Sequence, residues 1–400
     1  MMKVSYPVRL ALFGLGNRGQ RYLSWVAANP SKAVIAAVVD PDPLRRSRAC
    51  SQCLCAGFAD PDAFFSSGTG ADAVIIASPD SSHFAIAMAA MSHGMHVFVE
   101  KPMATTPAEC REMVLAAEHA SLVVSVCFEL RHHPYIARLK KVLDLPGMGR
   151  VVSANHIVNA GLDRSIHNFV RGGWSRLEDA GPVFLSKCSH DVDIMTFLCS
   201  QNIRRVHSFG SRSFFREENA PEGSAARCID CSVEKNCPFS AVGFYQRGNS
   251  NWTKYLMARD RETPEQTVLR ELREGRFGRC VFRCDNDVAD RQTVMLEMSG
   301  GAVATIQMNF MTLQDCRTSY FSCEGGEVWG DERTIRYRLF SDGVMHETDC
   351  SDIFGKPLHS GADNAIIENF IDTLCGEDSL KGTSAADALQ GHLACFAAEK

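Results

Sequence analysis

Three glycines near the start of the chain have the spacing of a dinucleotide-binding turn. Gly14, Gly16 and Gly19 follow an apolar run at Val8–Phe13 and open a helical pattern at Asn17–Ala28. The first glycine permits a tight turn, the second lets the backbone approach a pyrophosphate, and the third lets the helix pack on the strand. The N–H groups at the start of that helix would then face the phosphates.

A carboxylate stands where such a site needs one to bind a ribose. Asp40 closes the next apolar run, Ala33–Val39, and this position places its oxygens near the ribose hydroxyls. Because a carboxylate repels a 2′-phosphate, the sequence favours NAD(H). Arg45 and Arg46 lie just downstream and keep NADP(H) as an alternative. A tight turn without any ligand is the structural alternative.

The elements that must position this turn alternate between strand and helix over the first 128 residues. Continuous apolar strands separated by helices predict a parallel sheet that is covered on both faces. The further strands expected are Ala73–Ala77, His96–Val99 and Leu122–Phe128, and the further helices are His83–Ser92 and Thr106–His119.

The pattern changes after about residue 129. Strands become longer and alternate in polarity, as in Val151–Ile157, Gln292–Met298 and Ala302–Phe310, with a hairpin signal at Gly300-Gly301. Helices are expected at Asn364–Leu374 and Ala385–Ala398. The predicted fold class is therefore α/β plus α+β: an amino-terminal Rossmann domain with a parallel sheet, residues 1–128, followed by a carboxy-terminal α+β domain, residues 129–400, with an open, mostly antiparallel sheet and an irregular, cysteine-bearing excursion at about 214–284.

Two further segments give the chain a family resemblance. Together with the glycine turn, Val99-Glu100-Lys101-Pro102 and Lys187-Cys188-Ser189-His190-Asp191-Val192-Asp193 resemble the glucose–fructose oxidoreductase / inositol 2-dehydrogenase / rhizopine-catabolism family (Gfo/Idh/MocA). His359-Ser360-Gly361-Ala362-Asp363 is similar to its His-x-Gly-x-Asp stretch. The resemblance implies a Rossmann domain, a second domain whose open sheet forms an oligomer interface, and a reaction at one hydroxyl of a sugar, inositol or related polyol.

The resemblance also implies two catalytic residues. Lys101 would lie beside the nicotinamide, where an ammonium stabilises the charge that develops on the reacting oxygen. His190 would accept the hydroxyl proton. The family pattern Asp-x-x-x-His-x-x-Asp is broken at its first position, which is Ser186 here. Lys187, Asp191 or Asp193 could share that role, although His190 and Asp191 could instead cap a helix that begins nearby.

Other side chains are expected around the same site. The expected cofactor-binding residues are Gly14, Gly16, Asn17, Arg18, Gly19, Asp40, Ser78, Pro79, His83, Glu100 and Lys101. Weaker substrate candidates lie at the domain junction or in polar loops. For each of them, a solvated-loop or packing role fits the pattern at least as well as a substrate contact does. They are Arg131, Trp174, Arg176, His359 and Asp363.

The cysteines of the excursion have the spacing of thiolate metal ligands. Cys228, Cys231 and Cys237 lie within ten residues, and either Cys280 or Cys284 could complete the set. A structural zinc ion would supply folding energy that such a loop lacks. An iron–sulfur cluster does not match the usual spacings. Unliganded thiols are the equal alternative.

Composition limits the partners. Of 400 residues, 45% are hydrophobic and 22% charged, the formal net charge is -5, and no basic tract points to nucleic acid. No apolar run approaches the length of a membrane helix, and Met1–Pro7 lacks the features of a secretory signal. We therefore expect a cytoplasmic protein. The family resemblance implies a small-molecule sugar or polyol substrate and assembly as a homodimer or homotetramer through the carboxy-terminal sheet.

Three functions fit these features. The leading one is reversible hydride transfer between NAD(H) and a hydroxyl or keto group of a sugar or cyclitol. A glycoside hydrolase or lyase that recycles a tightly bound NAD would need nearly the same residues, and the loss of aspartate at Ser186 slightly favours it. A non-catalytic NAD-binding regulator is the third, and retention of Lys101 and His190 argues against it.

Overall fold

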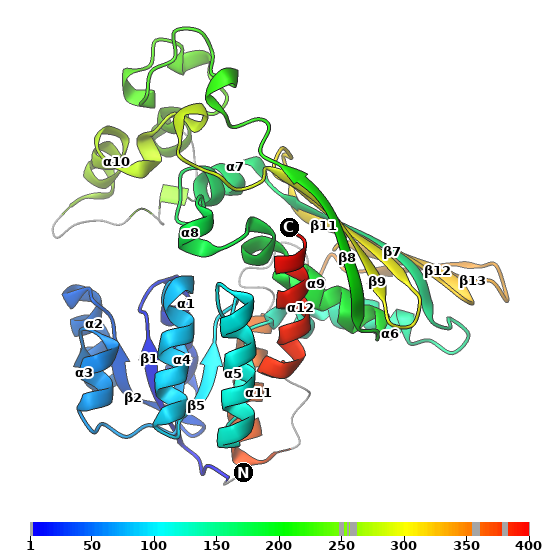
Figure 1. Cartoon of the computed structure of the whole chain (residues 1–400), viewed down its shortest axis with the longest axis horizontal. Coiled ribbons are helices and arrows are strands. Elements are labelled where there is room, and N and C mark those ends of the chain that lie inside the picture. The colour runs from blue at the N-terminus through cyan, green and yellow to red at the C-terminus, as the bar shows by residue number, and fades with distance from the viewer. Residues whose placement is uncertain are drawn as a thin grey trace.

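The chain forms two sheets joined by helices (Figure 1). The computed structural model describes residues 3–247, 252–253, 256, 262–353, 361–377 and 383–399. The first sheet is the parallel layer of a Rossmann domain, and the second is a long, mostly antiparallel sheet at the other end of the molecule. The predicted fold class is confirmed.

The amino-terminal sheet has the strand order β3-β2-β1-β4-β5-β6, and every neighbouring pair is parallel. Its central strands are buried along their whole length because helices cover both faces. The strands are β1 (Val8–Phe13), β2 (Ala33–Val39), β3 (Ala56–Phe58), β4 (Ala73–Ile76), β5 (His96–Val99) and β6 (Val124–Val126). The helices are α1 (Asn17–Ala28), α2 (Pro43–Cys53), α3 (Pro61–Ser66), α4 (His83–Ser92) and α5 (Pro107–Ala120).

The second sheet has the order β14-β13-β12-β11-β7-β10-β9-β8, in which only β7 and β10 are parallel neighbours. Buried and exposed residues alternate along its strands, because one face packs on helix α9 and the other faces outward. The strands are β7 (Val151–Ala160), β8 (Ile203–Ser211), β9 (Arg291–Met298), β10 (Val303–Asn309), β11 (Asp315–Cys323), β12 (Gly326–Gly330), β13 (Thr334–Leu339) and β14 (Met345–Asp349). Helices α6 (Pro134–Leu143), α7 (Leu162–Ser165), α8 (Leu177–Ala180) and α9 (Val183–Cys199) complete this part.

The cysteine-bearing excursion forms a separate lobe between β8 and β9 (Figure 1). Short turns dominate it, as the sequence predicts. It also contains helix α10 (Pro264–Arg273), which the sequence analysis missed although Thr263 and Gln266 form a capping box at its start. In the described part of the chain, no helix is long and apolar enough to cross a membrane.

The last two helices return to the Rossmann domain. On α11 (Ala362–Cys375), the Phe370 ring lies 5.3 Å from that of Phe98 on β5. On α12 (Ala385–Ala397), Nε2 of His392 accepts a hydrogen bond from the backbone N–H of Met103 at 3.0 Å. The boundary at residue 128 therefore separates the strands of the two sheets. The hydrophobic core of the first sheet, however, also contains side chains of α11, near the end of the chain.

Candidate active site

The glycine turn has the geometry that its spacing predicts. Gly14 has φ +91°, and a Cβ there would lie 2.5 Å from the carbonyl oxygen of Ala77. A Cβ on Gly19 would lie 2.0 Å from the carbonyl oxygen of Gly14, so the helix can approach the strand only without a side chain. A Cβ on Gly16 would meet no atom within 4 Å beyond its chain neighbours and the backbone of its own helix, so this position faces the open surface that a pyrophosphate needs. Helix α1 begins at Asn17 without a side-chain cap, so its first N–H groups are available to phosphate oxygens.

Asp40 lies directly against this turn. One carboxylate oxygen accepts the Leu15 N–H at 2.7 Å, and the other accepts the Asp42 N–H at 2.9 Å. The side chain is 5% exposed, which fixes it at the end of β2. The Arg46 guanidinium donates to the carbonyl oxygen of Asp40 at 2.6 Å, while Arg45 faces Asp42 at 3.7 Å. Neither arginine is therefore held in place for a 2′-phosphate.

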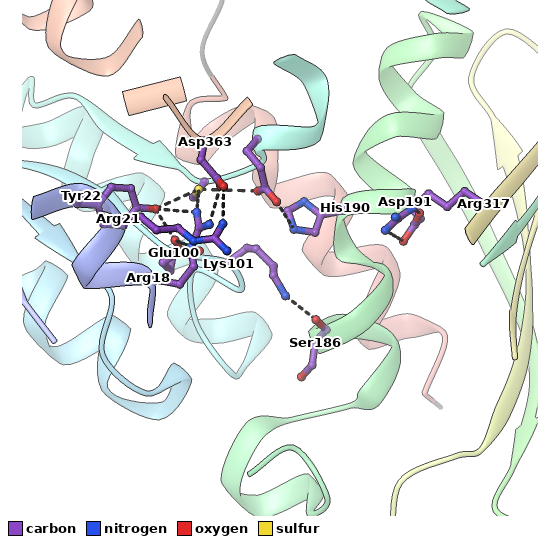
Figure 2. A network of polar contacts seen from close by, with 12 residues as sticks. Arg18, Arg21, Tyr22, Glu100, Lys101, Ser186, His190, Asp191, Arg317 and Asp363 are labelled. Carbon is purple, nitrogen blue, oxygen red and sulfur yellow. Dashed lines mark hydrogen bonds and ion pairs between the residues drawn. The ribbon is translucent and has the colours of Figure 1, made fainter. Parts of the chain in front are cut away.

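Lys101 connects the two domains at the carboxyl end of β5. Its ammonium donates a hydrogen bond to the backbone carbonyl of Ser186 at 2.6 Å (Figure 2). The Ser186 hydroxyl does not take up the role of the missing aspartate, because it donates to the carbonyl of Ala180 at 3.0 Å. Carboxyl ends of parallel strands are where such sheets bind ligands, so Lys101 lies in the region expected for the nicotinamide.

His190 lies one helical turn after Ser186 on α9, and residues four apart share a helix face. Its Nε2 lies 3.5 Å from a carboxylate oxygen of Glu129, and the ring is 7% exposed. Phe128 packs edge-on against the imidazole with a centroid distance of 5.4 Å. A histidine oriented by a buried carboxylate is the arrangement of a general base. The sequence analysis missed Glu129, whose only local signal is its place directly after the last Rossmann strand.

Arg18 fixes the residue next to Lys101 through an ion pair with Glu100. Its guanidinium pairs with Glu100 and with Asp363 at 2.6 Å, and Arg21 pairs with the other oxygen of Asp363 at 2.5 Å (Figure 2). The Tyr22 hydroxyl donates to the same Glu100 carboxylate. These contacts join α1, the end of β5 and α11. Arg18, Glu100 and Asp363 thus form an ion-pair network behind the predicted site, and Asp363 is engaged there rather than exposed to a substrate.

His83 supports Lys101 from the other side. The ring is fully buried, and its nitrogens lie 2.8 Å from the carbonyl oxygen of Pro102 and 2.9 Å from that of Ser78. It therefore ties the turn that contains Ser78 and Pro79 to the segment that carries Lys101. This contact makes His83 a positioning residue in the described structure.

Helix α9 begins at Val183, so His190 and Asp191 lie in its interior and neither caps its start. Asp191 is fully buried and accepts from Arg317 on β11 and from His156 on β7 at 3.0 Å. Burial alone would raise the pKa of the Asp191 carboxyl, but Arg317 and His156 hold it well below its usual range. The Asp191–His156–Arg317 cluster attaches α9 to the second sheet and faces away from Lys101 (Figure 2).

Replacing Arg317 by methionine should destabilise the protein strongly. The variant leaves the Asp191 carboxylate buried without its guanidinium, which costs about 3–5 kcal/mol in comparable pairs. The matched control is Arg336→Met, because the Arg336–Glu347 pair is more than half exposed on both sides and should cost no more than about 1 kcal/mol. Urea denaturation measures both values, and equal losses in the two variants would contradict the assignment.

The remaining charged candidates on α9 are engaged with the second domain. Lys187 is buried 3.6 Å from Asp315, and burial lowers the pKa of its ammonium to about 8 although Asp315 opposes the shift. Asp193 accepts two hydrogen bonds from Arg131, at 2.7 and 2.6 Å. Burial raises the pKa of Asp193 while Arg131 opposes it. The Arg131–Asp193 pair joins the start of the second domain to α9.

The loop candidates differ in their placement. The indole N–H of Trp174 donates to Asp80 at 2.9 Å, so it connects the second domain to the turn after β4. Arg176 pairs with Glu178 at 2.9 Å and lies 3.6 Å from Asp287. Neither contact involves Lys101 or His190. His359 lies outside the described residues.

The zinc prediction is not supported by the geometry. Among the residues that the structure describes, no group of three or more His, Cys, Asp or Glu side chains is arranged to hold a metal ion. Cys228, Cys231, Cys237 and Cys280 nevertheless line one cavity, whereas Cys284 does not.

The chain is similar to known oxidoreductases over part of its length. Residues 8–128 match the family described as "Oxidoreductase family, NAD-binding Rossmann fold" (GFO_IDH_MocA). The chain is 24% identical to the putative oxidoreductase YteT of Bacillus subtilis (strain 168), over 60% of this chain and 55% of that protein. It is 31% identical to inositol 2-dehydrogenase 1 of Saccharopolyspora erythraea, over 56% of this chain and 61% of that protein. The chain thus matches little more than half the length of these relatives.

Solved structures share the whole fold. A levoglucosan dehydrogenase in complex with NADH and levoglucosan matches with a TM-score of 0.70 at 17% identity, over 98% of this chain and 96% of that one. An oxidoreductase from Agrobacterium radiobacter in complex with NAD+, L-tartaric acid and magnesium matches with a TM-score of 0.69 at 18% identity, over 97% and 94%. At these sequence identities, the structural similarity establishes the fold alone.

Proposed function

We propose that this chain, whose residues 8–128 match the Gfo/Idh/MocA oxidoreductase family model, is an NAD-dependent dehydrogenase or reductase that acts on a CH–OH group. The observation that carries the proposal is the contact between Lys101, at the carboxyl end of β5, and helix α9, which also carries His190. Lys101 reaches the carbonyl of Ser186, one helical turn before His190. An ammonium and an oriented imidazole on one side of a dinucleotide site are the two groups that alcohol oxidation requires.

The residues of the first domain fit the cofactor. The open surface at Gly16 and the uncapped start of α1 would hold the pyrophosphate, and Asp40 would hold the ribose of the adenosine. Lys101 would lie beside the nicotinamide. When bound, NAD supplies the hydride acceptor for oxidation, or the donor for reduction.

The protein side chains then accept the substrate proton and stabilise the charge on the substrate oxygen. In the oxidation direction, His190 accepts the proton of the substrate hydroxyl, and the Glu129 carboxylate orients the ring and stabilises its charged form. Lys101 stabilises the negative charge that develops on the substrate oxygen as the carbon loses hydride. The surrounding side chains limit water, since His190, Glu129 and Ser186 are all at most 7% exposed.

The proposed substrate class is a sugar, inositol or related polyol. Relatives named inositol 2-dehydrogenase and a structural neighbour that binds levoglucosan support this class. The test is a spectrophotometric screen for NADH formation across sugars, inositols and sugar acids. A glycoside that is cleaved without net NADH release would replace the dehydrogenase with an NAD-recycling hydrolase. NAD binding without turnover of any of these compounds would favour a regulator.

Asp40→Ser should weaken the preference for NAD over NADP. Asp40 presents its carboxylate at the end of β2, so its removal takes away both a ribose acceptor and the repulsion of a 2′-phosphate. The ratio of kcat/KM for NAD to that for NADP should fall about tenfold or more, which corresponds to ~1.4 kcal/mol. Asp42→Ser, in the next turn but capping α2, is the control. An unchanged ratio in Asp40→Ser would contradict the assigned ribose contact.

We also propose that the second sheet mediates homo-oligomer formation. Its outward face carries exposed apolar side chains at Val152, Met295 and Val303, on β7, β9 and β10. Apolar residues gathered on one sheet face are typical of a protein interface.

A further inference from the structure

A histidine of the last helix binds the backbone directly after Lys101. Pro102 has no backbone N–H, so the first backbone donor that follows Lys101 is the N–H of Met103. This N–H donates to Nε2 of His392 on α12 at 3.0 Å, and both side chains are fully buried. A buried N–H must find a partner inside the protein. His392 therefore fixes the course of the chain next to Lys101.

The ring of His392 is a neutral acceptor. Its Nδ1 lies 2.9 Å from the carbonyl oxygen of Ala388, one turn earlier on α12, and a carbonyl oxygen can only accept. The ring proton is therefore on Nδ1, which leaves the lone pair of Nε2 for the Met103 N–H. Burial lowers the pKa of His392 to about 4; the bond to Ala388 opposes this shift, and the Lys101 ammonium adds to it. At neutral pH the ring is thus a permanent hydrogen-bond acceptor.

His392 also contacts the aromatic ring that packs on His190. The centroid of the Phe128 ring lies 5.5 Å from that of His392 and 5.4 Å from that of His190. Side chains in a close-packed interior have little room to shift, so the position of one ring limits the position of the next. His392 therefore supports the ring against which His190 is oriented.

Helix α12 is placed to act on both domains, because it packs on α5 of the Rossmann domain and on α9 of the second domain. A Cβ on its Gly391 would lie 3.7 Å from the side chain of Val192 on α9, so the two helices approach each other closely there. Just before α12, the carbonyl of Thr383 accepts the N–H of Val126, the last residue of β6, at 2.9 Å. The helix is thereby attached to the strand that leads to Phe128.

We propose that His392 is a positioning residue of this site, which sets the separation of Lys101 and His190. It acts on the first through the Met103 backbone and on the second through the Phe128 ring. The proposal rests on the dehydrogenase function proposed above. Charge stabilisation and proton transfer both depend on groups that are held precisely. Because Lys101 and His190 belong to different domains, a side chain from a third segment that contacts the surroundings of both can fix their relation.

The test compares His392→Leu with His392→Gln in the full-length protein. Leucine accepts no hydrogen bond, whereas the amide of glutamine can place an oxygen near the position of Nε2. We expect His392→Leu to lower kcat for substrate oxidation by about 10–100-fold, the effect of misplacing reacting groups by up to ~1 Å. KM for NAD should change little, since the glycine turn and Asp40 follow other strands. Glutamine should restore most of the lost rate. If leucine prevents folding, His392→Asn replaces it, because the shorter amide reaches the carbonyl of Ala388 but not the N–H of Met103.

The matched control is His96→Leu. His96 is also buried, and its Nδ1 accepts the backbone N–H of Val123 at 3.0 Å, but it lies at the amino end of β5, whereas Lys101 follows the carboxyl end. Both leucine variants should lower the thermal unfolding midpoint, and only His392→Leu should lower kcat. An equal loss of kcat in the two variants, or a His392→Leu variant that keeps the parent kcat, would overturn the proposal.

A second measurement does not depend on activity. Acylation of the Lys101 amine by a soluble reagent, followed by mass spectrometry, reports how firmly the ammonium is held against the carbonyl of Ser186. The reaction should become severalfold faster in His392→Leu and keep the parent rate in His96→Leu. An unchanged rate in His392→Leu would overturn the positioning role. A parent protein that binds NAD but oxidises no polyol would instead overturn the proposed function, and the acylation rates would still decide the role of His392.

Discussion

Replacing Lys101 by methionine should lower kcat for substrate oxidation by about 10²–10³-fold, the effect of removing one group that stabilises charge on a reacting oxygen. Methionine keeps much of the length of the side chain but removes its charge and its hydrogen bond to Ser186. Because the attraction between the Lys101 ammonium and the developing charge on the substrate oxygen is strongest in the transition state, kcat should fall more than substrate affinity does. Steady-state NADH formation measures the loss.

Two controls separate a catalytic effect from a structural one. Lys141→Met removes an exposed lysine of α6 and should leave kcat unchanged. NAD affinity of the Lys101 variant, followed by calorimetry, should change little, because the glycine turn and Asp40 are intact. If Lys101→Met keeps more than about a tenth of the parent kcat, a central role in charge stabilisation is wrong.

The parts of the site that the sequence could predict are those built from local geometry. Gly14, Gly16 and Gly19 lie within six residues, and their spacing after a strand indicates the turn by itself, although the atom that excludes a side chain at Gly14 is the carbonyl oxygen of Ala77. Asp40 could also be predicted from the local pattern, because it comes directly after the strand that follows the glycine turn and its helix. The long apolar strands of the first sheet are equally local, because burial on both faces leaves a continuous apolar run.

The start of helix α9 shows where local signals compete. A polar stretch around Ser189 resembles a helix start, so the sequence analysis allowed His190 and Asp191 to be capping residues. The helix in fact begins just after Gly181-Pro182, where Gly181 has φ +70° and ends the preceding short helix. The polar side chains of α9 are buried inside the protein, and only their tertiary partners explain why they are tolerated there.

Those partners come from distant parts of the chain, which is why the sequence alone could not identify them. Asp363 pairs with Arg18 across 345 residues, and Asp191 pairs with Arg317 across 126. Each charged residue could pair with many residues of opposite charge in the chain. The sequence does not show which of them the fold brings within contact distance. The same holds for Glu129 and His190, whose proximity depends on the docking of α9 against the end of β6.

The second large expected effect concerns His190. His190→Asn should lower kcat/KM by about 10²–10⁴-fold, because asparagine retains a polar side chain but cannot accept the hydroxyl proton. The increase of kcat/KM with pH that depends on this base should disappear in the variant. Imidazole added to His190→Ala should restore part of the rate, since the truncated side chain leaves space beside Phe128 and Glu129.

The Glu129 carboxylate provides the sharpest comparison for this prediction. Glu129→Gln keeps the imidazole but removes the charge 3.5 Å from its Nε2, so the loss should be smaller than in His190→Asn and imidazole should give no rescue. His119→Asn, at an exposed position near the end of α5, should behave as the parent does. A His190→Asn variant with an unchanged pH–rate profile would mean that another group takes the proton. Glu129, which lies beside His190, and Lys101, which contacts α9, would then be the candidates to test.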